Sequence, residues 1–377
     1  MPAGLYIHIP FCKSRCSYCD FATDVWRNDD GVARYVAALE KEISDFNFQT
    51  LNLPYNNFDT IYFGGGTPSL LTPFQLDRIL KLVGDKFDVA TDAEITVEMN
   101  PATVTPEKLA AFRSSGVNRA SFGVQTFDDR ALKLLARGHD ANDARATFEM
   151  LRNAGFDNVS FDLIAGLPGQ TLKGWQTNLD EAISMSPEHL SLYLLEIHDG
   201  TPLADQIRSK RQPRPDGELA AEMYEMMLGR LADAGYGQYE ISNFARPGFE
   251  SRHNSKYWTL DPVHGFGVSA HSFDGNQRYA NERDTAKYVE MIENSRSSEI
   301  MRENIDRSSE FIFLGLRLEN GISLTEYREQ FDEDLINKYS GEIDHLIDLG
   351  LVLNAGGRLR LTRRGKLYSN EVFAAFV

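Results

Sequence analysis

Cysteine is scarce in this sequence: its 377 residues include three cysteines, and all three lie between positions 12 and 19. A disulfide framework needs an even number of cysteines, usually spread along the chain, so this set excludes an ordinary disulfide-stabilised domain. Clustered thiols in a reducing compartment are more often metal ligands or redox groups. The few cysteines therefore indicate one metal or redox site close to the N-terminus.

Long apolar runs are also missing. No segment approaches the roughly 20 residues of a transmembrane helix. The first residues, MPAGLYIHIPF, lack the basic region, apolar core and cleavage site of a secretory signal. We therefore expect a cytoplasmic protein without a transmembrane segment, and a peripheral membrane contact stays open.

An excess of basic residues is absent as well: 39 basic residues face 55 acidic ones, for a formal net charge of −16. Proteins that bind nucleic acid nonspecifically need a basic surface that displaces counterions from the phosphates. A small basic cluster near the C-terminus is better interpreted as a solvated or docking surface; it consists of Arg358, Arg360, Arg363 and Arg364. We expect no nucleic-acid partner.

Short runs rich in Val, Ile, Phe and Tyr alternate with amphipathic helical patterns up to about residue 200. The predicted strands are Leu5–Ile9, Thr60–Phe63, Glu94–Met99, Arg119–Val124, Val159–Ile164 and Leu190–Ile197. Repeated strand–helix units predict an α/β fold, in which helical crossovers join the strands of a parallel sheet. Six units are too few for a closed eight-stranded barrel, so we expect an open, partial barrel or a doubly wound sheet.

The rest of the chain has a different pattern. Residues 236–300 include a β-rich passage. Residues 301–377 predict helices, one of them long and ending near Leu349, and then strand, Gly-Gly turn, strand and helix, similar to a winged-helix module. We predict three parts: the sheet with its helices in 1–235, a β-rich connecting segment in 236–300 and a C-terminal domain in 301–377.

Ligands of open α/β sheets bind at the carboxyl ends of the strands. Here those ends carry glycines and polar residues, namely Gly64, Gly65, Gly66, Glu98, Asn100, Gln125, Asp162 and Glu196. Any one of them is explained equally well as a helix cap or a solvated loop residue. Together they predict a ligand site along one edge of the sheet.

The cysteines follow the first predicted strand with the spacing Cys12-x3-Cys16-x2-Cys19. A structural zinc site usually has four protein ligands, and His8 is available as the fourth. A [4Fe–4S] cubane held by three thiolates instead leaves one iron free for a small chelating molecule. The spacing by itself leaves both a zinc site and an open cubane as interpretations.

This spacing, with the aromatic Tyr18 before the last cysteine, resembles the radical S-adenosylmethionine superfamily. The resemblance implies a partial (β/α)6 barrel and a [4Fe–4S] cluster held by Cys12, Cys16 and Cys19. It also implies S-adenosylmethionine on the fourth iron and an external electron donor. In enzymes of this superfamily, reduction of the cluster cleaves the sulfonium to a 5′-deoxyadenosyl radical.

The glycine run after the second strand is similar to a superfamily motif whose backbone contacts the methionine amino group, with Thr67 in place of the usual acidic residue. Its form, GGGTPS, resembles the subgroup of oxygen-independent coproporphyrinogen III oxidase (HemN) and the heme chaperones named HemW. Without the resemblance, Arg137 would be interpreted as a solvated helix residue. With it, the implied S-adenosylmethionine contacts are Tyr6, Gly65, Gly66, Thr67, Glu98, Gln125, Arg137 and Asp162.

Three features favour the HemW group over the oxidase. Phe21 stands where the oxidase has a fourth cysteine. Only eleven residues precede Cys12, whereas the oxidase has a long N-terminal segment that closes over its substrate. The residues from His253 to Trp258 read HNSKYW and match the HNxxYW motif of the HemW group.

This closer resemblance implies a heme chaperone that delivers heme to acceptor proteins, respiratory enzymes among them. Imidazole is a good axial ligand of heme iron, so His253 is the expected heme contact, ahead of His264 and His271. Two alternatives stay open. One is a radical enzyme that decarboxylates coproporphyrinogen III to protoporphyrinogen IX, and the other is a zinc-stabilised binding module.

Overall fold

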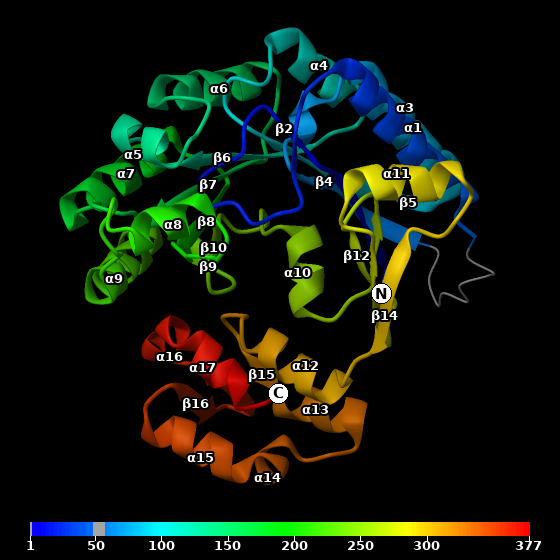
Figure 1. Cartoon of the computed structure of the whole chain (residues 1–377). Coiled ribbons are helices and arrows are strands. Elements are labelled where there is room, and N and C mark those ends of the chain that lie inside the picture. Colours follow the sequence, from blue (N-terminus) through cyan, green and yellow to red (C-terminus); the bar gives the residue numbers. More distant parts are fainter. Residues whose placement is uncertain (1, 48–56) are drawn as a thin grey trace.

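A large, mostly parallel sheet dominates the structure, a computed structural model that describes residues 2–47 and 57–377. In these residues twelve strands form one sheet in the order β14-β13-β12-β11-β1-β4-β5-β6-β7-β8-β10-β9. The strands from β11 to β8 run parallel, and the flanking strands are antiparallel. The sheet ends at β14 and β9 and stays open across the described residues (Figure 1).

The bounds of these strands are β1 Ala3–Ile9, β4 Asn57–Gly65, β5 Asp88–Met99, β6 Arg119–Gln125, β7 Val159–Ala165, β8 His189–Leu194, β9 Gly237–Gln238, β10 Asn243–Ala245, β11 Val263–Phe266, β12 His271–Phe273, β13 Gln277–Asn281 and β14 Glu299–Asn304. The six predicted strands are confirmed as β1, β4, β5, β6, β7 and β8. The last prediction is too long, because the chain leaves the sheet after Leu194 and exposes Ile197.

Residues 236–300, predicted as a connecting segment, add strands to both sides of the parallel strands: β9 and β10 beside β8, and β11 to β13 beside β1. Tyr288, Val289 and Ile292 of this segment pack into the same apolar core as the parallel strands. The division of the chain at residues 235 and 300 stays a prediction.

Helices cover the outer face of the parallel strands (Figure 1). Their bounds are α1 Asp29–Asp45, α3 Pro73–Lys86, α4 Pro106–Ser114, α6 Ala141–Asn153, α7 Leu172–Met185, α9 Gly217–Asp233 and α11 Thr285–Glu293, with a short 3-10 helix η1 at Pro68–Leu70. Two further helices, α5 Asp129–Leu134 and α8 Pro202–Arg208, lie beside the cysteine loop. Threonine caps open several of them, and Thr72 forms a complete capping box with Gln75. No helix in the described residues combines the length and the apolar character that a membrane span requires.

The parallel strands have two different faces. Alternate residues such as Leu5, Val97 and Phe161 point outward and pack against the helices in one apolar core. The residues between them are polar and form an inner face; they include Tyr6, His8, Thr60, Tyr62, Glu98, Arg119, Ser121, Ser160, Asp162, His189, Ser191 and Tyr193. Parallel strands are usually apolar on both faces. The polar side chains of this inner face therefore indicate a binding site for a polar ligand.

Helix α10 (Arg252–Trp258) carries the HNxxYW motif and contacts β1, β4 and α12. In Figure 1 it lies between the sheet and the C-terminal helices. His253 of this helix reaches the inner face, where its ring stacks on Tyr62 at 5.0 Å between centroids. The motif thus connects the main sheet to the C-terminal domain.

The C-terminal domain has its own apolar core, which includes Ile312, Tyr327 and Leu359. Its elements are α12 Arg307–Gly315, β15 Ile322–Ser323, α13 Leu324–Phe331, α14 Leu335–Lys338, α15 Ser340–Asp348, β16 Val352–Ala355, β17 Arg358–Leu361, α16 Arg363–Leu367 and α17 Ser369–Ala374. The Gly-Gly turn between two strands is confirmed. The single long helix is wrong, because the backbone turns at Tyr339 (φ −116°, ψ 33°) and divides it into α14 and α15.

Two helical glycines of this domain give a matched stability test. A Cβ on Gly365 in α16 would overlap the carbonyl oxygen of Leu351, whereas no described atom lies within 4 Å of a Cβ on Gly341 in α15. We expect Gly365→Ala to lower the free energy of unfolding by about 1–3 kcal/mol through overpacking. Gly341→Ala should leave it equal or raise it by up to about 1 kcal/mol. Urea denaturation of both variants checks this, and equal effects would contradict it.

Candidate iron–sulfur cluster and cofactor site

The cysteine loop follows β1 and is fixed at two points. Cys12 ends the short strand β2 (Phe11–Cys12), which pairs in parallel with β3 (Asp24–Val25) beyond the cysteines. In the middle of the loop, Ser17 donates its backbone N–H to the Leu135 carbonyl at 2.9 Å and its hydroxyl to the Leu134 carbonyl at 3.0 Å. The three cysteines are therefore held between β1 and α5, partly buried and without a disulfide.

Two side chains donate hydrogen bonds to the thiols. Thr67 Oγ1 lies 3.6 Å from Cys12 Sγ, and an Arg137 guanidinium nitrogen lies 3.4 Å from Cys16 Sγ. Burial raises the pKa of Cys12 to about 11 and also raises the pKa of Cys19. Metal ligation needs thiolates, so a cluster must displace these protons, and both donors favour the charged form.

The donor set fits a cluster with one open iron better than a single-ion site. In residues 2–47 and 57–377, no group of three or more His, Cys, Asp or Glu side chains surrounds one metal position. A cubane needs another arrangement, because each thiolate binds a separate iron. His8, the fourth zinc ligand considered above, instead engages the Ala22 carbonyl at 3.0 Å and the Tyr6 hydroxyl at 3.1 Å.

The glycine run brings bare backbone close to the cysteine loop. Gly65 has a φ of 109°, in the left-handed region, and donates its N–H to Glu98 Oε2 at 3.1 Å. A Cβ on Gly66 would lie 2.7 Å from the backbone of Pro10, just before the loop. Both positions require glycine, which leaves an open backbone edge that a cofactor can approach.

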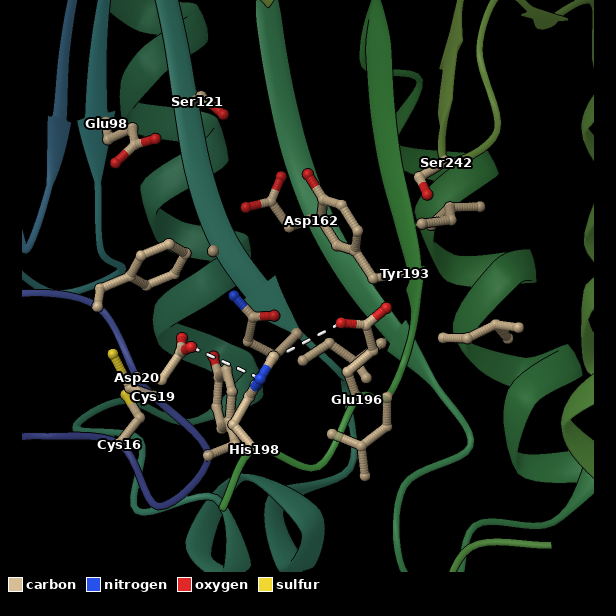
Figure 2. A pocket seen from close by; sticks show the side chains of 18 of the residues that line it. Cys16, Cys19, Asp20, Glu98, Ser121, Asp162, Tyr193, Glu196, His198 and Ser242 are labelled. Atoms are coloured by element: carbon tan, nitrogen blue, oxygen red, sulfur yellow. Dashed lines mark ion pairs between the residues drawn. The ribbon is translucent and has the colours of Figure 1, made fainter. Parts of the chain in front are cut away.

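Two half-buried carboxyl groups, Glu98 on β5 and Asp162 on β7, face the same space on either side of β6 (Figure 2). Glu98 accepts a hydrogen bond from the Tyr62 hydroxyl at 2.7 Å, and burial raises its pKa. Burial and the charge of Glu98 raise the pKa of Asp162 to about 7. Carboxyl groups in such surroundings suit hydroxyl or ammonium partners, which ribose and the methionine amino group supply.

These residues line one cleft of about 590 Å³, which we call the central cleft. Its wall includes Cys12, Cys16, Cys19, Tyr6, Gly65, Gly66, Glu98, Gln125, Arg137 and Asp162. Of the other predicted positions, Asn100 and Glu196 also line it, whereas Gly64 and Thr67 lie outside its wall. The carboxyl ends of the strands and the cysteine loop thus meet at one place.

The position of Arg137 differs from the one that its local sequence predicts. It is not a solvated helix residue: it follows α5, is half-buried, and donates to Asn100 Oδ1 and the Gly123 carbonyl at 2.6 Å each. With Cys16 as a further acceptor, its charge lies against the cluster loop. A contact between Arg137 and the carboxylate of S-adenosylmethionine stays a prediction.

His253 lies outside the wall of the central cleft, beneath the inner face of the sheet. Its ring is 1% exposed, with Nδ1 2.8 Å from Thr60 Oγ1 and Nε2 3.1 Å from the Tyr257 hydroxyl. Burial lowers its pKa to about 3, so the imidazole is neutral. Both ring nitrogens are engaged within the protein, and heme ligation at His253 requires that Tyr257 move away.

Several residues of the cleft wall were missed by the sequence analysis, among them Asp20, Tyr193, His198, Arg317 and Lys366. The sequence could have indicated Tyr193, because the alternation of side chains along β8 places it on the same face as Ser191. Arg317 and Lys366 had no such signal, because they enter the wall from the C-terminal domain.

Comparison with known proteins decides the family. Residues 6–182 match the radical SAM superfamily and residues 303–368 match the HemN C-terminal domain. The chain is 37% identical to the heme chaperone HemW of Bacillus subtilis, over 99% of this chain and 98% of the relative. The chain belongs to the HemW family. The HemW of Lactococcus lactis is 34% identical, over 100% of this chain and 97% of the relative.

Proteins similar to this chain are also found outside bacteria. The mitochondrial radical S-adenosyl methionine domain-containing protein 1 of Mus musculus is 35% identical, over 93% of this chain and 82% of that protein. Among solved structures, coproporphyrinogen III oxidase (HemN) from Escherichia coli superimposes with a TM-score of 0.86 at 26% identity, covering 100% of this chain and 90% of that one. Radical SAM membership implies a [4Fe–4S] cluster and S-adenosylmethionine, and the central cleft of this HemW family member fits both.

The cysteines and Arg137 give a test of the cluster site. We expect Cys12→Ser, Cys16→Ser and Cys19→Ser each to lose most bound iron and sulfide after anaerobic reconstitution. Arg137→Gln should keep the cluster but lower its midpoint potential, on the order of tens of millivolts, because an N–H···S bond and a positive charge are lost. Iron and sulfide analysis and a redox titration measure these effects.

The exposed Arg130 on the neighbouring helix α5 provides the control. Arg130→Gln should match the unmodified protein in cluster content and potential. Full iron and sulfide in Cys16→Ser, or an unchanged potential in Arg137→Gln, would show that the cluster site has been assigned wrongly.

Proposed function

We propose that this protein is a heme chaperone that binds heme together with a [4Fe–4S] cluster and S-adenosylmethionine and passes heme to acceptor proteins. The observation that carries the proposal is its similarity, over nearly the whole chain, to proteins named heme chaperone HemW. An external donor would reduce the cluster, and heme-containing respiratory enzymes are the expected acceptors. We expect this transfer to take place in the cytoplasm.

The shape of the central cleft supports a second ligand beside the cofactor. The cleft runs from the cysteine loop past β8 to residues of the C-terminal domain, including Arg317 and Leu367. Phe21 lines the cleft, and 64% of its surface is exposed. It stands at the position where coproporphyrinogen III oxidase has a fourth cysteine.

Each cofactor residue has a defined part in this proposal. Cys12, Cys16 and Cys19 would hold the cluster, and the bare backbone at Gly65 and Gly66 would receive the methionine end of S-adenosylmethionine. Glu98 and Asp162 would accept hydrogen bonds from its hydroxyl or ammonium groups. When bound, the reduced cluster supplies an electron to the sulfonium.

A second function has a specific observation in its favour, namely the TM-score of 0.86 with coproporphyrinogen III oxidase. In that case the same cleft would hold coproporphyrinogen III, and the chain would decarboxylate it with a 5′-deoxyadenosyl radical. Phe21 in place of the cysteine and the HNxxYW helix argue for the chaperone.

One pair of anaerobic assays separates the two functions. With the cluster reconstituted, we expect a stoichiometric Soret band on titration with hemin, and transfer of that heme to an apo heme protein. With reductant, S-adenosylmethionine and coproporphyrinogen III, we expect no protoporphyrinogen IX. Absence of heme uptake would end the chaperone proposal, and decarboxylated product would favour the oxidase.

A further inference from the structure

The outer end of the central cleft lies between the main sheet and the C-terminal domain. Apolar and aromatic side chains form much of its wall there, including Tyr193 and Leu195 after the sheet, Ile241, and Leu367 of α16. Tyr193 is 40% exposed on this wall. A flat, apolar ring system would cover these side chains, since aromatic faces favour such packing.

Arg317 provides a cation at this end. Its guanidinium stacks on the Trp258 ring at 4.3 Å from the centroid, and its nearest carboxylate oxygen, Glu240 Oε2, is 3.5 Å away. Its Nε and this Glu240 oxygen are both buried without a hydrogen-bond partner among the described residues. The Arg317 side chain is 25% exposed, and its guanidinium donates no hydrogen bond to the described residues, so it has donors available for an anionic group.

Two other cations of the wall, Lys366 and Arg137, are more fully engaged, and Arg15 lies on the cysteine loop. Lys366 donates to Gln238 Oε1 at 2.7 Å and also pairs with Glu319. Arg137 donates to Asn100, Gly123 and Cys16 at the cofactor end. Arg317 is therefore the cation at the outer end best able to form a paired hydrogen bond with a carboxylate.

One imidazole lies on the wall of the same cleft, beside Asp20 at the end of the cysteine loop. Of the eight histidines, all within the described part of the chain, only His198 lines the central cleft. Its side chain is 43% exposed, with Nδ1 3.6 Å from Asp20 Oδ2 and Nε2 3.7 Å from Glu196 Oε2. Figure 2 shows the ring between these two carboxylates. Both distances exceed a normal hydrogen bond, so a ring nitrogen is available to a metal.

A carboxylate beside a ligating imidazole is a common support for metal binding, because it orients the ring and raises its basicity. His253, by contrast, is 1% exposed, and both of its nitrogens are engaged by Thr60 and Tyr257. Between these two histidines, the geometry favours His198 as the one that reaches an iron in the cleft.

We propose that heme binds in the central cleft and extends to its outer end, with His198 as an axial ligand of its iron and Arg317 binding a propionate. This inference rests on the proposed heme-binding function and locates its ligand. The HNxxYW helix then has a structural role in place of heme ligation: the Trp258 ring stacks on Arg317, and His253 packs against the sheet.

Anaerobic hemin titration of the full chain with its cluster reconstituted tests this location. His198→Ala should shift the Soret band, change the spin-state signature in electron paramagnetic resonance and weaken binding at least about tenfold. Arg317→Gln should weaken binding about tenfold or more while leaving the Soret position unchanged. His253→Ala should keep the spectrum of the unmodified protein, as should the control His345→Ala, at an exposed position of helix α15.

A measurement on the unmodified protein covers the case in which Arg317→Gln fails to fold. Hemin dimethyl ester, in which both propionates are esterified, should bind about tenfold more weakly than hemin. Equal binding of the two probes, or an unchanged spectrum in His198→Ala, would overturn the location while the chaperone function stands. If the unmodified protein takes up no hemin, the proposed function itself fails.

Discussion

The polar inner face of the parallel sheet is the constraint on which the rest of the structure depends. Buried polar groups need partners, and this face supplies them in pairs across neighbouring strands. Tyr62 donates to Glu98 at 2.7 Å, and Ser160 lies 2.7 Å from His189 Nδ1. With its side chains held by one another, the face can present carboxyl and hydroxyl groups to a polar cofactor without rearranging.

The opposite face supplies the stability. Its apolar residues pack with the helices into one large core, which includes Trp175, buried with its indole N–H on the Met223 carbonyl at 2.9 Å. Such burial contributes roughly 25 cal/mol for each Å² of apolar surface removed from water. Because the outer face provides this support, the inner face and the cysteine loop can be shaped for binding.

Helix α10 joins this sheet to the C-terminal domain. Its His253 fills the space beneath β1 and β4, and its Trp258 lies under Arg317 of the C-terminal domain. The carboxylate nearest to Arg317 is that of Glu240, with Oε2 at 3.5 Å. Its Oε1 accepts hydrogen bonds from the Ser242 N–H and from Asn243 Nδ2. One short motif therefore contributes to the packing of both domains, and its Trp258 contacts Arg317 at the outer end of the central cleft.

The sequence by itself determined the cysteine loop, the parallel strands, the glycine positions and most of the strand-end residues that line the central cleft. These features are local: ligand spacing, alternation along a strand, helix caps and a positive φ each depend on a few neighbouring residues. Only the tertiary structure decided that Arg137 is half-buried against Cys16, that both nitrogens of His253 are engaged, and that His198 and Arg317 share one cleft. Those contacts join residues far apart in the chain, and no sequence period records how α10 and the C-terminal domain pack.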